Sequence, residues 1–172
     1  VLYALKDYLG EATINRALQR LIALLANTSE ATSVDFLNIL KEEAEPGYLT
    51  LIEDLFEKIT LYDLATTDSR VEPLSNGRFR VSIDVEASKI YADKLGNETR
   101  TALDYPVDIG VFLRSPLSPD FTTDDVLYLE KHAPGSGAST FEVIVDERPS
   151  FVGIDPYGKL IDRDSRDNLA GI

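Results

Sequence analysis

The spacing of apolar residues changes once along this chain, near residue 60, and that change constrains the fold most strongly. Before residue 60 the apolar residues recur every three or four positions, which is the period of an amphipathic α-helix. After residue 60 they alternate with polar residues, which is the period of a β-strand with one face in water. The sequence therefore predicts an α+β protein with an N-terminal α-helical subdomain, residues 1–62, followed by an antiparallel β-sandwich, residues 63–172.

Four helical segments are predicted in the first subdomain. The first ends at Gly10, the polar residues 27–29 end the second, Ser33 is the expected N-cap of the third, and Pro46-Gly47 ends the third. We expect the apolar face of the second helix to pack in the core; it consists of Ile14, Leu18, Leu21, Ile22 and Leu25. The inward residues of the fourth are expected to be Leu49, Ile52, Leu55, Phe56 and Ile59, with Glu53, Asp54, Glu57 and Lys58 in water.

The strands are predicted from runs in which apolar residues occupy every second position. The first run follows the turn dipeptide Asn76-Gly77, a second turn is expected at residues 95–97, and residues 115–119 form a proline-rich break before a short apolar run at 126–129. The alternating apolar residues are Phe79, Val81, Ile83 and Val85, then Val107, Ile109, Val111 and Leu113, and finally Phe141, Val143 and Val145. Several short strands separated by turns are typical of a β-sandwich.

Charge and composition exclude several classes of function. The net charge is −13 and neither half of the chain carries a basic stripe, so nucleic acid and anionic membrane surfaces are unsuitable partners. The absence of cysteine excludes disulfides, thiolate zinc sites and cysteine nucleophiles. No apolar run approaches the roughly 20 residues that a membrane-spanning helix needs.

The residues that usually carry catalysis are sparse. His132 is the single histidine, and we interpret it as a solvated residue at the end of a strand. The residue types of a Ser/His/Asp triad are present, but the G-x-S-x-G motif of a nucleophile elbow is not. We interpret Gly135-Ser136-Gly137 as a hairpin loop. The acidic runs 42–45 and 124–125 are interpreted as a solvated helix end and a turn.

The segment 162–168 offers the one candidate metal site. Asp162, Asp164 and Asp167, with Asn168, supply the hard oxygen ligands that Ca²⁺ prefers. The glycine that an EF-hand loop requires at its sixth position is replaced by Asp167. We therefore favour a solvated turn and keep weak Ca²⁺ binding as the alternative. No other catalytic, cofactor-binding or metal-binding residue is assigned.

Several stretches together resemble M1-family zinc aminopeptidases (gluzincins). VLYALKDYLGEATINRALQRLI resembles the helix pair that follows the active-site tyrosine of that family, and SVDFLNILKEEAEPGYLTLIEDLFEKITLYDL resembles the close of its helical domain. NGRFRVSIDVEASKIYAD, DYPVDIGVFL, LYLEKH and FVGIDPYGKLIDRDSRDN resemble the β-sandwich that follows. The sequence of these stretches is most similar to a bacterial subgroup in which the peptidase-like domain is joined to ABC-2-type permease membrane segments.

The resemblance implies a division of labour between this chain and a preceding domain. The zinc-binding H-E-x-x-H motif, a further glutamate ligand and the oxyanion-stabilising tyrosine would lie upstream, and Tyr3 does not match that tyrosine. A first helix without a capping residue, in a chain that does not start with methionine, fits this expectation. The chain would then be an inactive, soluble C-terminal part that supports the peptidase domain in cis. The parent would bind Zn²⁺, cleave peptides and reside at a bacterial membrane.

Two other interpretations stay open. The chain is either a self-contained interaction module without peptidase function, or part of a relative whose upstream domain has lost its zinc ligands. An exposed apolar patch larger than a few hundred Å² marks a contact surface. A patch on the helix stripes would indicate packing against a preceding domain, and a patch on the sandwich would indicate a separate partner.

Overall fold

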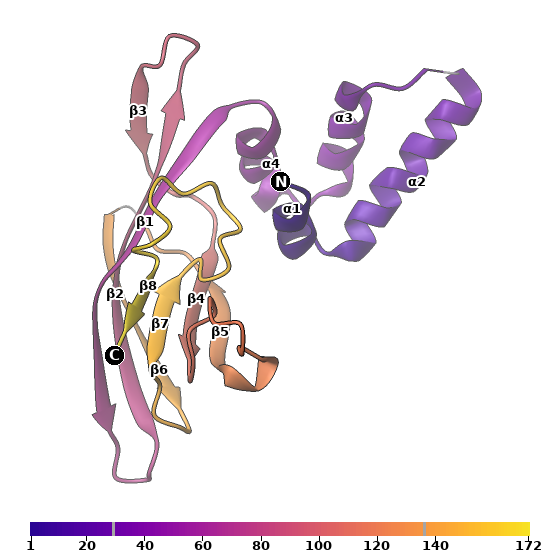
Figure 1. The fold of residues 1–172 in the computed structure, drawn as a ribbon. Coiled ribbons are helices and arrows are strands. Elements are labelled where there is room, and N and C mark those ends of the chain that lie inside the picture. Colours follow the sequence, from indigo (N-terminus) through magenta and orange to yellow (C-terminus); the bar gives the residue numbers. More distant parts are fainter. Residues whose placement is uncertain (29, 136) are drawn as a thin grey trace. The chain divides into compact units, whose positions relative to one another are not determined.

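The computed structural model describes residues 1–28, 30–135 and 137–172, and it confirms the α+β order of elements. The chain forms two compact units, Val1–Ile59 and Thr60–Ile172 (Figure 1). The division therefore lies between Ile59 and Thr60, whereas the sequence analysis placed it after residue 62.

The helical unit contains α1 (Leu2–Leu9), α2 (Glu11–Thr28), α3 (Ser33–Glu43), the 3-10 turn η1 (Pro46–Tyr48) and α4 (Leu49–Phe56). Gly10 ends α1 with φ of 77°, a conformation that glycine adopts without strain, and its N–H donates to the carbonyl of Lys6 at 3.0 Å. The core of the unit draws on all four helices and consists of Leu5, Ala17, Leu37, Leu40 and Ile52.

Several local predictions in this unit are wrong. The N-cap of α3 is Thr32, one residue before Ser33, because Thr32 and Asp35 form a reciprocal capping box. The helix α4 ends at Phe56, and Ile59 already begins a strand; both side chains, expected to point inward, are exposed. Asp54, expected in water, is buried and lies 3.5 Å from the Lys58 ammonium.

Among its described residues, the strand unit contains two four-stranded antiparallel sheets. The first joins β1 (Ile59–Pro73), β2 (Phe79–Ala92), β3 (Glu98–Thr101) and β6 (Gly137–Val145), with β2 paired to the other three. The second has the order β5 (Val126–His132), β4 (Val107–Phe112), β7 (Phe151–Ile154) and β8 (Leu169–Gly171). A 3-10 turn, η2 (Thr123–Asp125), precedes β5. The strand β2 lies against β7 of the other sheet, so the two sheets share a core.

The strand β2 confirms the predicted alternation, whereas β4 departs from it. Val81, Ile83 and Val85 of β2 are fully buried between half-buried polar residues. All six residues of β4 are buried, including Asp108 and Phe112, because the loop after β7 covers the second face of β4: Lys159 contacts Asp108 and the Tyr157 ring contacts Phe112.

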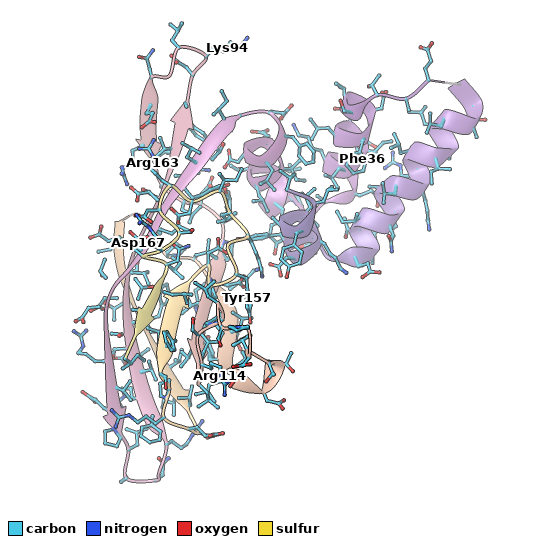
Figure 2. The ribbon with its side chains drawn as sticks, viewed as in Figure 1. Phe36, Lys94, Arg114, Tyr157, Arg163 and Asp167 are labelled. Atoms are coloured by element: carbon cyan, nitrogen blue, oxygen red, sulfur yellow. The ribbon has the colours of Figure 1, made fainter. Side chains whose placement is uncertain are left out.

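The segment 161–168 closes part of the outer edge of β1. The Tyr62 N–H donates to the Ile161 carbonyl at 2.9 Å, and the Thr66 N–H donates to the Asp167 carbonyl at 2.8 Å. In return, the Arg163 N–H donates to the Tyr62 carbonyl at 3.0 Å. Figure 2 shows Arg163 and Asp167 beside β1, where this segment replaces a neighbouring strand.

Candidate functional site

The apolar face of α2 points to solvent rather than into the core, which corrects the sequence interpretation. Leu18, Ile22 and Leu25 are 42%, 64% and 43% exposed, whereas Ala17 is fully buried. Ile14 and Leu21, on the border of the face, are half-buried. We call Leu18, Ile22 and Leu25 the α2 stripe. At 1.5 Å per residue it extends over about 10 Å of helix.

Ion pairs and the burial of Ala17 show which face of α2 meets α3. Arg16 Nε lies 2.8 Å from Glu43 Oε2, and Arg20 contacts Glu43 at 2.9 Å and Glu42 at 2.5 Å. The hydrogen bond from Arg16, followed in size by the one from Arg20, holds the pKa of the Glu43 carboxyl below its usual range. Figure 2 shows Phe36 of α3 between α3 and α2. The arginine face of α2 therefore meets α3 and leaves the α2 stripe outward.

Further apolar residues are exposed on α1. Val1, Leu2 and Tyr3 are 50%, 68% and 67% exposed, whereas Leu5 of the same helix is fully buried. In the strand unit, by contrast, the large exposed apolar side chains are spread over turns and separate strands; they are Leu95, Leu117, Ile144, Ile161 and Ile172. The apolar exposure of this chain is thus densest on the helical unit.

The acid/base candidates of the sequence are not assembled into a catalytic group. His132 ends β5 as expected, but it is half-buried: its Nε2 lies 2.5 Å from the Tyr128 hydroxyl and its ring contacts Phe141 at 5.1 Å. Burial and the hydrogen bond to Glu130 raise the pKa of Tyr128. Ser136 of the predicted hairpin loop lies outside the described residues.

The acidic runs take part in local structure. Glu42 and Glu43 are held by the α2 arginines, as described above. Asp125 caps η2, since the Thr122 N–H donates to its Oδ2 at 2.8 Å, and it lies 3.7 Å from Arg114 Nε. These contacts place both runs in helix ends and turns, as the sequence analysis interpreted them.

The three aspartates of the candidate Ca²⁺ site are engaged separately. Asp164 receives two hydrogen bonds of 2.7 Å from the Arg166 guanidinium, which holds the Asp164 pKa below its usual range. Asp162 accepts the Leu64 and Asp164 N–H groups at 3.2 and 3.1 Å and, in the amide orientation that satisfies both partners, the Asn168 amide at 2.9 Å. Burial raises the pKa of Asp162 and of Asp167. Within the described ranges, no three His, Cys, Asp or Glu side chains are grouped to hold a metal ion.

A buried charge cluster in the strand unit was missed by the sequence analysis. Asp108 of β4 is 5% exposed, and its two carboxylate oxygens lie 2.8 Å from Lys131 Nζ and 2.6 Å from Lys159 Nζ. The signal was an aspartate inside the apolar run Val107–Phe112, which we interpreted as the wet face of a strand. The two lysines together engage both oxygens of this buried carboxylate.

Asp155 lies next to this cluster and shapes the loop after β7. It has φ of 42°, and its buried carboxylate accepts the N–H groups of Lys159 and Leu160, each at 3.0 Å. Its own N–H donates to the Asp108 carbonyl at 2.8 Å. Burial raises the Asp155 pKa to about 6. The carboxylate therefore holds the loop in place at a cost in charge desolvation.

No helix among the described residues is long and apolar enough to cross a lipid bilayer. Comparison of the chain with protein-family models, with curated proteins and with solved structures finds no match.

Proposed function

We propose that the chain is the non-catalytic C-terminal part of an M1-like zinc metallopeptidase in a membrane-associated bacterial protein. In this proposal the α2 stripe packs against the peptidase domain of the same polypeptide. The observation that supports the proposal is the outward direction of the α2 stripe, a helix face with core spacing that nothing in the described chain covers.

The chemistry of the stripe suits packing against an apolar protein surface. Its three side chains are aliphatic, and the two arginines of α2 are engaged by Glu42 and Glu43 on another face. Covering the exposed part of Leu18, Ile22 and Leu25 would contribute about 1 kcal/mol for each side chain. No charge has to be desolvated to gain this energy, which favours a permanent contact over a transient one.

The zinc of such a parent would be bound outside this chain. The residues present do not fit a peptidase zinc site, because His132 is the single histidine and its Nε2 is bonded to Tyr128. No step of peptide hydrolysis is therefore assigned to any residue here. The contribution of the chain is mechanical: it gives the peptidase domain a helical surface to pack on and a strand unit that follows it.

A photo-cross-linking experiment tests this proposal. A photoreactive phenylalanine analogue replaces Ile22 in the protein as its source cells make it, and a second protein carries it at Lys94, in the turn between β2 and β3 (Figure 2). We expect the adduct at position 22, mapped by mass spectrometry, to join two segments of one membrane-associated polypeptide that contains H-E-x-x-H. The Lys94 control should give no adduct with that segment.

Two results would overturn the proposal. A position-22 adduct with a second protein would identify the chain as an interaction module that docks through its helices. A source polypeptide of about 19 kDa in the soluble fraction would show that no peptidase domain accompanies the chain.

A further inference from the structure

The strand β6 pairs with β2 along one of its two edges. The register runs without interruption from Phe79↔Val145 to Ala87↔Gly137, and within the described residues β6 pairs with no other strand. In an antiparallel pair, successive residues direct their backbone N–H and C=O groups to opposite edges of the strand. Every second residue of β6 therefore presents its backbone groups away from β2.

Bonds at the two hairpins of β2 show which residues these are. The Asp93 N–H donates to the Asn97 carbonyl at 3.0 Å on the side of β3 and β6, and the Leu74 N–H donates to the Arg78 carbonyl at 2.8 Å on the side of β1. Odd-numbered residues of β2 thus face β6. Their partners on β6 are also odd-numbered, so the outward backbone groups belong to Ala138, Thr140, Glu142 and Ile144.

The opposite edge of the same sheet is protected. Between Tyr62 and Thr66, β1 is closed by the segment 161–168, as described above. Beyond Thr66, the exposed side chains of β1 include Asp68, Arg70 and Glu72, all charged, before the strand ends at Pro73. Charged side chains and proline are the usual means by which an edge strand avoids pairing. Among the described residues, the edge of β6 from Thr140 to Ile144 has neither a covering strand nor a proline.

The side chains along the β6 edge define what would pair with it. Thr140 and Ile144 are β-branched and exposed, Ile144 by 46%, and the exposed Glu142 lies between them on the same face. Cross-strand side-chain pairs would stabilise an added strand most if it placed an apolar side chain beside Ile144 and a cation beside Glu142. A second copy of this chain is less suitable, because it would bring its own net charge of −13 to the same edge.

We propose that the β6 edge accepts an extended segment of another protein as an added strand, with a Lys or Arg beside Glu142 and an apolar residue beside Ile144. The backbone groups of Ala138 to Ile144 supply the hydrogen bonds of this pairing, and the side chains select the partner. This inference is independent of the α2 stripe and of the proposed function.

The probe for the test is a nine-residue, end-blocked, fluorescein-labelled peptide of alternating valine and threonine with a central lysine; the matched peptide carries glutamate there. We expect the lysine peptide to bind the whole chain more tightly. On binding, amide exchange at Thr140, Glu142 and Ile144, measured by NMR, should slow at least about tenfold, as hydrogen-bonded amides do. Ser139 and Phe141, already bonded to β2, should change little.

Two variants and one control make the test specific. Glu142→Pro removes an outward N–H without removing a bond to β2, and it should abolish binding. Glu142→Lys retains the strand. It should lower the affinity for the lysine peptide by about twofold to fivefold and raise the affinity for the glutamate peptide by a similar factor. Val71→Pro is the control at the opposite edge: because the Leu74 backbone faces β2, the Val71 N–H points away from β2, and its loss should leave binding unchanged.

Three results would overturn the proposal. The first is that the lysine and glutamate peptides bind with the same affinity, both to the original chain and to the Glu142→Lys variant. The second is slow exchange at Thr140 and Glu142 before any peptide is added. The third is a dimer of the original chain, seen by sedimentation, that Glu142→Pro dissociates, because the edge would then belong to a second copy.

Discussion

Lys159 Nζ lies 2.6 Å from Asp108 Oδ2, and the two side chains are only 5% and 6% exposed. This buried pair, with Lys131 on the other carboxylate oxygen, joins β4, β5 and the loop after β7. A buried charge whose partner is removed is expensive, because the desolvation cost of the remaining charge is no longer offset.

Asp108→Ala should therefore lower the free energy of unfolding by about 3 kcal/mol, since both lysines lose the carboxylate that they contact. Urea unfolding followed by circular dichroism measures this change. Asp164→Ala is the matched control: it removes a pair to the exposed Arg166 and should cost less than about 1 kcal/mol. Equal losses in the two variants would contradict this account of the cluster.

Asp155 should make the protein less stable as the pH rises from 4 to 7. Its folded-state pKa of about 6 lies above the ordinary value of 3.8, so the folded chain keeps a proton in this range that the unfolded chain has released. That proton stabilises the folded state below pH 4, and the benefit, up to about 3 kcal/mol, is lost as the pH passes 6.

Asp155→Asn tests this pH dependence, because asparagine does not titrate. It keeps one acceptor oxygen for the Lys159 or the Leu160 N–H, and the loss of the other bond costs the same at every pH. The free energy of unfolding of the original chain minus that of the variant should fall between pH 4 and pH 7. A difference that is constant with pH would show that Asp155 titrates normally.

Gly153 of β7 should not tolerate a side chain. A Cβ at this position would lie 2.5 Å from the Asn168 carbonyl oxygen and 2.7 Å from Leu169, so β7 and β8 would have to separate. Gly153→Ala should cost about 2 kcal/mol or more and lower the melting temperature by several degrees. Gly47→Ala, where nothing lies within 4 Å, should change it by less than a degree or two. A Gly153→Ala protein as stable as the original would refute the close approach.

The α2 stripe should contribute little to the stability of the isolated chain. Ile22→Gln changes an exposed side chain and should alter the free energy of unfolding by no more than about 0.5 kcal/mol. Leu40→Ala removes a fully buried side chain of the helical core and should cost about 2–5 kcal/mol. A large loss for Ile22→Gln would mean that the stripe is covered within the chain itself.

The periodicity of apolar residues predicted the order and type of the elements, because local spacing depends on whether a helix or a strand presents one face to the core. Gly10 and Asn76-Gly77 were located correctly, since their signals are local. Periodicity also showed that α2 has an apolar face. It did not show that the face is exposed, because tertiary contacts decide that the side of α2 with Arg16, Ala17 and Arg20 meets α3.

The misjudged positions in the strand unit have a similar cause. Whether Asp108 lies in water depends on whether a distant segment covers that face of β4, and here Lys159 of the loop after β7 does so. The contacts of Asp155 and Lys159 likewise come from the loop after β7. To predict the burial of Asp108 and the contacts of Asp155 and Lys159, one would have to know how distant segments pack together, which a single sequence does not carry.

The closure of β1 by the segment 161–168 has a consequence for synthesis. Leu64 and Asp162 are 98 positions apart, and Thr66 and Asn168 are 102 apart, so these bonds form only after nearly the whole strand unit has been translated. At ordinary elongation rates that interval is about 5–20 s. During it the first strand to leave the ribosome has one edge without its final neighbour, and the nascent chain depends on slow, non-local pairing to complete the sheet.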